Sequence, residues 1–137
     1  MRKQINSIFV YLFFIACWIF FFYFYPYHLH YKEQITLCVL QPDFLQTYLQ
    51  KPAFLTEICG DYLTQFFLWT GGGSSILTLT FVFTWLGLRI ALRKTGITSH
   101  VSLWALLPIV AEWALSCHLE YPLSMSLGLM CSVWAFS

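Results

Sequence analysis

The stretch SIFVYLFFIACWIFFFYFY, residues 7–25, contains no charged residue and decides the class of fold. A helix needs ~20 apolar residues to cross the hydrocarbon core of a bilayer, and this stretch is about that long. MRK precedes it, as in a signal peptide, but no small-residue cleavage site follows. Tyr23, Tyr25 and Tyr27 instead form an aromatic belt of the kind found at membrane interfaces. We therefore predict an uncleaved membrane anchor with its N-terminus in the cytoplasm.

The composition of the chain agrees with a membrane location. Of its 137 residues, 59% are hydrophobic, 20% are aromatic and only 9% are charged, which is unlike a soluble domain. A soluble fold of this size could not cover so much apolar surface, whereas lipid accepts it. The sequence predicts an all-α membrane protein with three to four transmembrane helices and an extracytoplasmic segment that is interfacial or re-entrant.

The apolar stretches define a single transmembrane domain, residues 1–137. Beyond the first span, the predicted spans cover about 67–92, 101–117 and 122–137, and residues 26–66 form the outer segment. Pro108 is expected to kink the third span, and GGGSS at 71–75 to permit a bend or close helix packing. Crossing requires ~17 residues or more, and the fourth span stops short of that length. We therefore expect the chain to be truncated at its C-terminus.

The outer segment is expected to be largely helical. YKEQITLCVL, residues 31–40, fits either a strand or a helix, whereas DFLQTYLQ, residues 43–50, predicts a short helix that Pro52 stops. After Pro52, apolar residues recur at helical spacing and predict an amphipathic interfacial helix. Its apolar stripe comprises Phe54, Leu55, Ile58, Cys59, Tyr62, Leu63, Phe66 and Phe67.

The charges are segregated along the chain. The basic blocks are Arg2 with Lys3 and Arg89 with Arg93 and Lys94, whereas the acidic residues Glu33, Asp43, Glu57, Asp61 and Glu120 lie elsewhere. Because cytoplasmic loops carry an excess of Lys and Arg, we place the basic blocks in the cytoplasm. The scattered cations lack the phosphate-facing patch that nucleic-acid binding needs. The expected partners are the lipid bilayer and other membrane helices or subunits, and no nucleic acid.

HLHYKEQ, residues 28–34, directly follows the first span and could form a metal site. On an extended segment, His28 and His30 would point the same way, as zinc or copper ligands could. Glu33 or His118 could supply a third ligand if the outer ends of spans one and three are neighbours. The favoured alternative is a pair of interfacial histidines between the aromatic belt and water, because two ligands do not make a site. No cofactor is predicted.

Three carboxylates are candidates for catalysis: Glu33, Asp61 and Glu112. Glu112 lies within the third span, where a carboxylate is a functional-site candidate by default. It could serve a proton, ion or catalytic role, although pairing with His118, Lys32 or a serine hydroxyl is the favoured interpretation. Glu57 and Asp61 lie four residues apart on one helix ridge and could perform acid–base work or hold a divalent cation. Such a row is more often a solvated face.

The remaining motifs give little chemistry. Five cysteines show no CxxC pair, but Cys38 and Cys59 share the outer segment and could form a disulfide if that compartment oxidises thiols. No Ser, His and acid set can be assigned, so hydrolase chemistry has no specific support.

Three segments together resemble the start of an uncharacterised family of bacterial polytopic membrane proteins, a domain of unknown function: YPYHLHYKEQITL, DFLQTYLQKPAFLTEICGDYLTQFF and HLEYPLSMSLGL. The most specific pieces are YKEQ at 31–34, LTQFF at 63–67 and HLEY at 118–121. Members commonly carry a glycine pair where this chain has Ala53 and Phe54. The resemblance implies longer proteins of the bacterial inner membrane with further spans. It implies no activity and no functional residue.

Two functions of different class follow from these features. The favoured one is a non-catalytic or incomplete membrane module that assembles with further spans or subunits. The alternative is part of a membrane enzyme acting on a lipid-linked envelope substrate, by analogy with glycosyltransferases that carry acidic residues in the first outer loop, where Glu33, Asp43 and Asp61 lie here. A transporter fragment is third, supported by Glu112 and a glycine-interrupted span. The chain alone is not expected to be an enzyme.

Overall fold

A computed structural model describes residues 2–35, 46, 48–96 and 100–137. All the elements within these ranges are helical, which confirms the predicted all-α class. They are α1 (Arg2–Ile19), the π-helix η1 (Phe20–Phe24), α2 (Pro26–Ile35), α4 (Phe54–Thr64), the 3₁₀ turn η2 (Gln65–Leu68), α5 (Gly72–Lys94), α6 (Val101–Trp104), α7 (Leu106–Ser116) and α8 (Leu123–Phe136).

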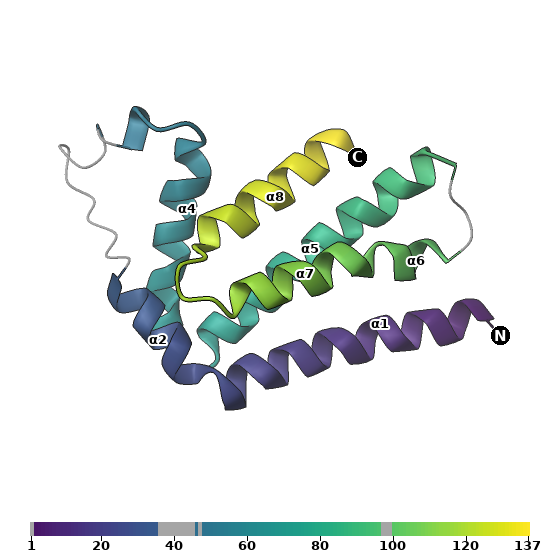
Figure 1. Cartoon of the computed structure of the whole chain (residues 1–137), viewed down its shortest axis with the longest axis horizontal. Coiled ribbons are helices and arrows are strands. Elements are labelled where there is room, and N and C mark those ends of the chain that lie inside the picture. The colour runs from purple at the N-terminus through teal and green to yellow at the C-terminus, as the bar shows by residue number, and fades with distance from the viewer. Residues whose placement is uncertain (1, 36–45, 47, 97–99) are drawn as a thin grey trace.

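Figure 1 shows α1, α5 and the α6–α7 pair running alongside one another, with α8 packed on α5 and α4. Helices α2 and α4 gather at one end of this bundle. The N-terminus of α1 and the connection after α5 lie at the opposite end. The two ends are therefore built from different parts of the sequence, and α5 is the helix that most of the others contact.

The first apolar stretch ends in a sharp bend. The π-helical turn η1 follows α1, and the axis then turns by 73° between Ile8–Phe24 and Pro26–Gln34. Proline is favoured at the first position of a helix and disfavours helical geometry in the residue before it, so Pro26 both ends η1 and starts α2. The segment that begins YKEQ is consequently helical as far as Ile35, and residues 36–40 lie outside the described ranges.

The glycine run sets the start of α5. Gly71 adopts a positive φ of 84°, which glycine accepts without strain. A Cβ on Gly73 would lie 3.0 Å from side-chain atoms of both Leu29 and Phe67, so the run also permits close packing, as predicted. The predicted second span starts near residue 67, whereas the helix α5 begins at Gly72, because η2 and the turn at Gly71 separate residues 65–71 from it.

The third apolar stretch is interrupted at Ala105, between α6 and α7. Pro108 follows three residues later. Its ring removes one backbone N–H and crowds the carbonyl of the residue four positions earlier, Trp104. This accounts for the interruption between α6 and α7. Trp85 of α5 donates its indole N–H to the Ser102 carbonyl at 3.1 Å and holds the broken helix against the bundle.

Helix α4 forms where predicted, but its apolar stripe is not its buried face. Leu55 and Tyr62 are 64% and 52% exposed, whereas the buried residues of the helix are Gly60 and Thr64. The reason is the close approach of α8: a Cβ on Gly60 would lie 2.8 Å from the backbone nitrogen of Ser124. The preceding helix predicted at 43–50 lies mostly outside the described residues.

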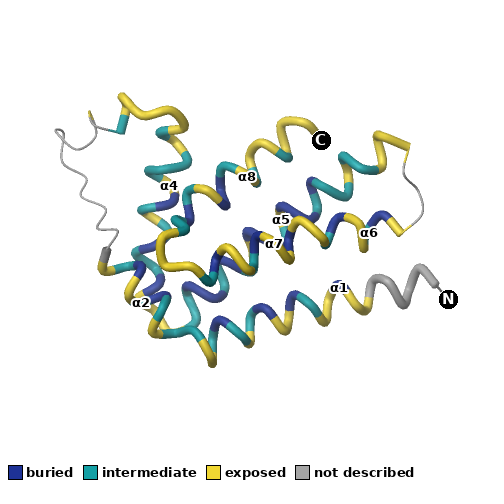
Figure 2. Tube along the Cα trace, viewed as in Figure 1, coloured by how far each residue is buried: buried dark blue, intermediate teal, exposed yellow. Residues whose placement is uncertain are grey.

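The core lies between α1, α5 and α7 and continues under α2 and η2, as the dark segments of Figure 2 show. It contains Val10, Phe14, Phe21, Leu29, Phe67, Leu77, Phe81, Trp85, Ala105, Ile109, Leu123 and Leu127. Among the described helices, α5 is long and apolar enough to cross a membrane, and the bent α1–α2 pair would add a second if it counts as one span. The α6–α7 pair and α8 are shorter apolar helices, so three to four spans are not confirmed.

Candidate functional site

The two histidines of HLHYKEQ diverge. Because α2 is a helix, residues two positions apart project to nearly opposite sides, and the prediction that His28 and His30 point the same way is wrong. His30 lines a small cavity of about 40 Å³ next to Phe67 and Gly71. His28 packs edge-on against Tyr25, with ring centroids 5.1 Å apart.

His28 instead lies beside His118, which the sequence placed at the neighbouring end of the third span. Burial and the nearby Lys32 ammonium lower the pKa of His28, partly offset by a hydrogen bond with the His118 backbone. Its Nε2 atom is buried and unbonded in the described part of the chain. Glu33 is half-buried on the same helix. Within that part of the chain, no three His, Cys, Asp or Glu side chains are placed to hold a metal ion.

Lys32 is the most constrained charged side chain of α2. It is 8% exposed, and its Nζ donates to the backbone carbonyls of Ser116 and Tyr121, each at 3.0 Å. Ser116 ends α7, and the last carbonyls of a helix lack partners within it and carry partial negative charge. Burial lowers the pKa of Lys32 to about 8. The lysine therefore holds α2 against the carboxyl end of α7.

Glu112 is 2% exposed on α7. Neither of its carboxylate oxygens has a hydrogen-bond partner within the described ranges, and the same holds for the hydroxyls of Ser116 and Ser126. We refer to these three residues as the buried carboxyl cluster. Of the partners predicted for Glu112, a serine is the one found beside the carboxyl group, namely Ser126 of α8. Lys32 points to the carbonyls at the end of α7, and His118 is exposed beside His28.

A cavity of about 390 Å³ opens between α2, α4 and the turn before α8. We name it the α2–α4 pocket. It brings the candidate Asp61 together with Lys32, and it is lined by Tyr31, Lys32, Asp61, Thr64, Leu119, Glu120, Tyr121, Pro122 and Leu123. Tyr121 also borders the buried carboxyl cluster, because its phenol lies beside Ser126. Burial raises the pKa of this phenol. Tyr121 therefore lies between the pocket and the cluster.

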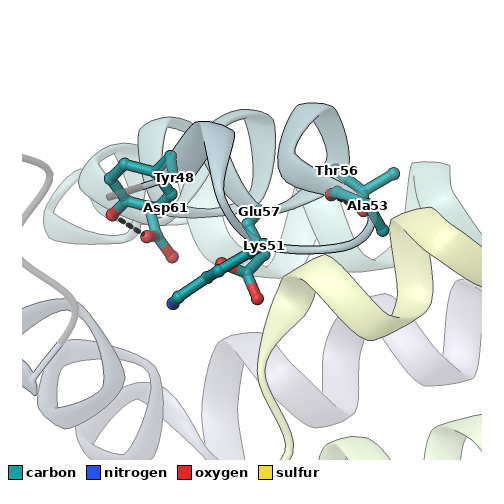
Figure 3. Close-up of polar contacts among 6 residues, drawn as sticks. All are labelled: Tyr48, Lys51, Ala53, Thr56, Glu57 and Asp61. Carbon is teal, nitrogen blue, oxygen red and sulfur yellow. Dashed lines mark hydrogen bonds and ion pairs between the residues drawn. The ribbon is translucent and has the colours of Figure 1, made fainter. Parts of the chain in front are cut away.

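The acidic ridge of α4 has separate partners for its two carboxylates, as Figure 3 shows. Tyr48 donates its hydroxyl to Asp61 Oδ2 at 2.5 Å, and Lys51 Nζ lies 3.0 Å from Glu57 Oε2. Thr56 donates to the Ala53 carbonyl at the start of the same helix. Paired-carboxylate chemistry needs two carboxylates that converge on one point, and here each is engaged elsewhere. Both carboxylates are half-buried, and each is paired with a neighbouring side chain.

Sequence reasoning missed the position of Lys32. The sequence offers Lys32 only as a pairing partner for Glu112, whereas the structure gives its ammonium two backbone carbonyls as partners. Its place shortly after an aromatic belt is a signal that it lies near the apolar interior. Cys59 is exposed on α4, while Cys38 and Asp43 lie outside the described residues, so the disulfide stays a prediction.

Comparison with known proteins places the chain in a family. A model described as "Family of unknown function (DUF6057)" matches residues 1–137. No curated protein and no solved structure matches the chain. The resemblance to a domain of unknown function is therefore confirmed, while the bacterial source and the membrane location stay predictions. Over its whole length, the chain belongs to the DUF6057 family of unknown function.

Proposed function

We propose that the chain is an integral membrane module, without catalytic activity of its own, that packs against lipid and further membrane helices or subunits. The observation that carries this proposal is the apolar surface of α1. Ile8, Phe9, Leu12 and Ile15 are 56–60% exposed along a helix stretch that contains no charge. Soluble monomers rarely expose contiguous apolar patches of this kind, whereas a hydrocarbon environment accepts them.

The ends of the bundle support a definite orientation. Residues Arg2, Arg93 and Lys94 lie at the end that holds the N-terminus, and Asp61 and Glu120 lie at the end formed by α2 and α4. The positive-inside rule then puts the first end in the cytoplasm. Helix α5 has 23 residues, which at 1.5 Å per residue extend about 34 Å and cover the ~30 Å hydrocarbon core.

The shorter helices support assembly with further helices. On α8 the Met125 side chain is 61% exposed, and so is Leu107 of α7. Such exposed apolar faces fit contacts with neighbouring membrane helices as well as with lipid.

A thiol-labelling experiment tests the membrane orientation. Cys59 is exposed on α4, and Thr95 is exposed just after α5 at the other end of the bundle. In variants whose only cysteine is Cys59 or Thr95→Cys, a membrane-impermeant maleimide should label Cys59 in intact cells. It should label Thr95→Cys only after permeabilisation. Equal labelling of both, or release of the protein from membranes by alkaline carbonate, would contradict the proposal.

A membrane enzyme acting on a lipid-linked envelope substrate is the second candidate, and the α2–α4 pocket is the observation that favours it. The pocket has about 390 Å³ and carries Asp61 and Glu120 in its lining. A photoreactive amino acid at Leu119, in the pocket lining, should crosslink to a polyprenyl-phosphate probe in membranes. The same amino acid at Leu103, on α6, is the control. Equal crosslinking at both positions would show general contact with lipid and would remove this candidate.

A further inference from the structure

Glu112 is a buried carboxyl group whose negative charge has no compensating partner among the described residues. The residue is 2% exposed, and both of its oxygens lack hydrogen-bond partners among the described residues. Ser116 and Ser126, at 1% and 0% exposed, carry hydroxyls that are unpartnered in the same way. Burying an ionised carboxylate without a partner is very unfavourable, and such a group is neutralised or binds a cation. Among the described residues, no cationic side chain is paired with this carboxyl group, so it must take up a proton or another cation.

The groups that face Glu112 supply no cation to pair with it. Helix α5 carries no titratable side chain between Gly72 and Leu88, and the only one on α8 is Cys131. From the turn before α8, the phenol of Tyr121 approaches Ser126 and Glu112. From α2, Lys32 directs its ammonium at the carbonyls of Ser116 and Tyr121. The nearby phenol of Tyr121 and thiol of Cys117 are neutral at neutral pH, since burial raises the pKa of both groups.

A proton suits this environment better than a metal cation does. A metal cation needs several ligands that converge on it. Among the described residues, no three His, Cys, Asp or Glu side chains lie together in this way, and Glu112 is the only carboxylate of the buried carboxyl cluster. A proton removes the charge of the carboxylate and also provides a donor. That donor matches the unpartnered Ser126 hydroxyl beside it.

We infer that Glu112 is a proton-binding site whose carboxyl group stays neutral in the folded protein at neutral pH, with Ser126 as its hydrogen-bond partner. The O–H group of the neutral carboxylic acid donates a hydrogen bond to Ser126 Oγ, and the proton stays on Glu112. Tyr121 joins the cluster to the α2–α4 pocket, so proton exchange with solvent takes place on that side. The inference rests on burial within the bundle and stands whether or not the proposed membrane crossing is right.

Infrared spectroscopy of the purified full chain in lipid vesicles at neutral pH tests this inference. A neutral carboxylic acid has a C=O stretching band distinct from the carboxylate bands. The wild type should show this band and Glu112→Gln should lose it. Glu120→Gln is the matched control, because it removes an exposed carboxylate eight residues further along and should keep the band. Ser126→Ala should shift the band to higher frequency without removing it, since the acid loses its hydrogen bond.

Two results would overturn the inference. If the wild type has no acid band at neutral pH, Glu112 is ionised. A thermal stability that then depends on sodium but not on choline, in the wild type and not in Glu112→Gln, would identify a metal cation as the ligand instead. If the band is present but unchanged in Glu112→Gln, the neutral acid is another residue. Should Glu112→Gln fail to fold, uniform ¹³C labelling of glutamate assigns the wild-type band to Glu or to Asp, and an Asp band overturns the inference.

Discussion

Lys32 and Lys51 lie at the same end of the molecule, and each holds two parts of the chain together, but their surroundings differ. Lys32 is 8% exposed and donates to the backbone carbonyls of Ser116, at the end of α7, and Tyr121, in the turn before α8. Lys51 has a side chain that is 51% exposed and pairs with Glu57, itself 33% exposed. Both contacts have the same 3.0 Å length. Distance alone therefore does not rank them, and burial does.

The difference separates a structural contact from a surface one. Water screens an exposed ion pair and solvates either partner when the other is removed, so such pairs contribute little to stability. The Ser116 carbonyl has no such substitute once Lys32 is lost, because that contact is buried, and the Tyr121 carbonyl is partly buried. The polar groups that matter for this fold are thus the ones that lie inside it, at the junction of α2, α7 and the turn before α8.

Replacing Lys32 should produce the largest effect. Lys32→Met keeps most of the length and the apolar stem of the side chain but removes the hydrogen bonds to the Ser116 and Tyr121 carbonyls. We expect it to lower the free energy of unfolding by about 2–4 kcal/mol, because a buried carbonyl and a partly buried one lose their donor. Equilibrium unfolding in detergent micelles measures this change. A loss below about 1 kcal/mol, the range of exposed pairs, would mean that water replaces the ammonium and that the contrast with Lys51 fails.

The pH dependence of stability should show the same residue titrating. Burial lowers the pKa of Lys32 from 10.5 to about 8, so between these values the unfolded chain binds more protons than the folded one. The free energy of unfolding should therefore rise with pH from about 8 to 10.5. Partial solvent access limits the rise to less than about 3 kcal/mol. Lys32→Met should lack this rise, and an identical slope in both proteins would show that Lys32 is solvated.

A pair of glycines tests whether α4 is held by its buried face. A Cβ on Gly60 would lie 2.8 Å from the Ser124 nitrogen, whereas one on Gly128 meets only Thr56 Oγ1 at 4.0 Å. Gly60→Ala should lower the free energy of unfolding by about 1–3 kcal/mol, because backbone must move. Gly128→Ala should leave it unchanged or raise it by up to about 1 kcal/mol through helix propensity. Thermal unfolding measures both, and equal effects would show that α4 does not pack closely on α8.

Local sequence signals predicted the parts of the fold that depend on local chemistry. The apolar stretch at 7–25, the interruption near Pro108 and the turn at the glycine run all follow from properties of a few adjacent residues. Helix α5 begins later than the predicted second span because apolar character continues through Phe66 and Phe67, and hydropathy cannot distinguish a 3₁₀ turn from the helix that follows it.

The site was harder to predict because it depends on contacts between distant residues. The geometry of His28 and His30 depends on whether α2 is helical, and the short apolar run that follows them fits strand or helix equally. The buried face of α4 is set by the approach of Ser124 to Gly60, which no periodicity within α4 can show. Glu112 was recognised from its apolar surroundings alone. Its neighbour Ser126 could not be chosen from the many serines of the chain.

The smallest effect on stability is expected for Lys51, the more exposed of the two lysines. Lys51→Met removes an ion pair whose partners are 51% and 33% exposed, and it should change the free energy of unfolding by less than about 0.5 kcal/mol. A double-mutant cycle with Glu57→Gln measures the coupling between the two side chains directly. The coupling should fall further as salt is raised, because ions screen exposed charges. A coupling above 1 kcal/mol that persists in high salt would mean that this pair is shielded from water, and burial would then no longer distinguish the two lysines.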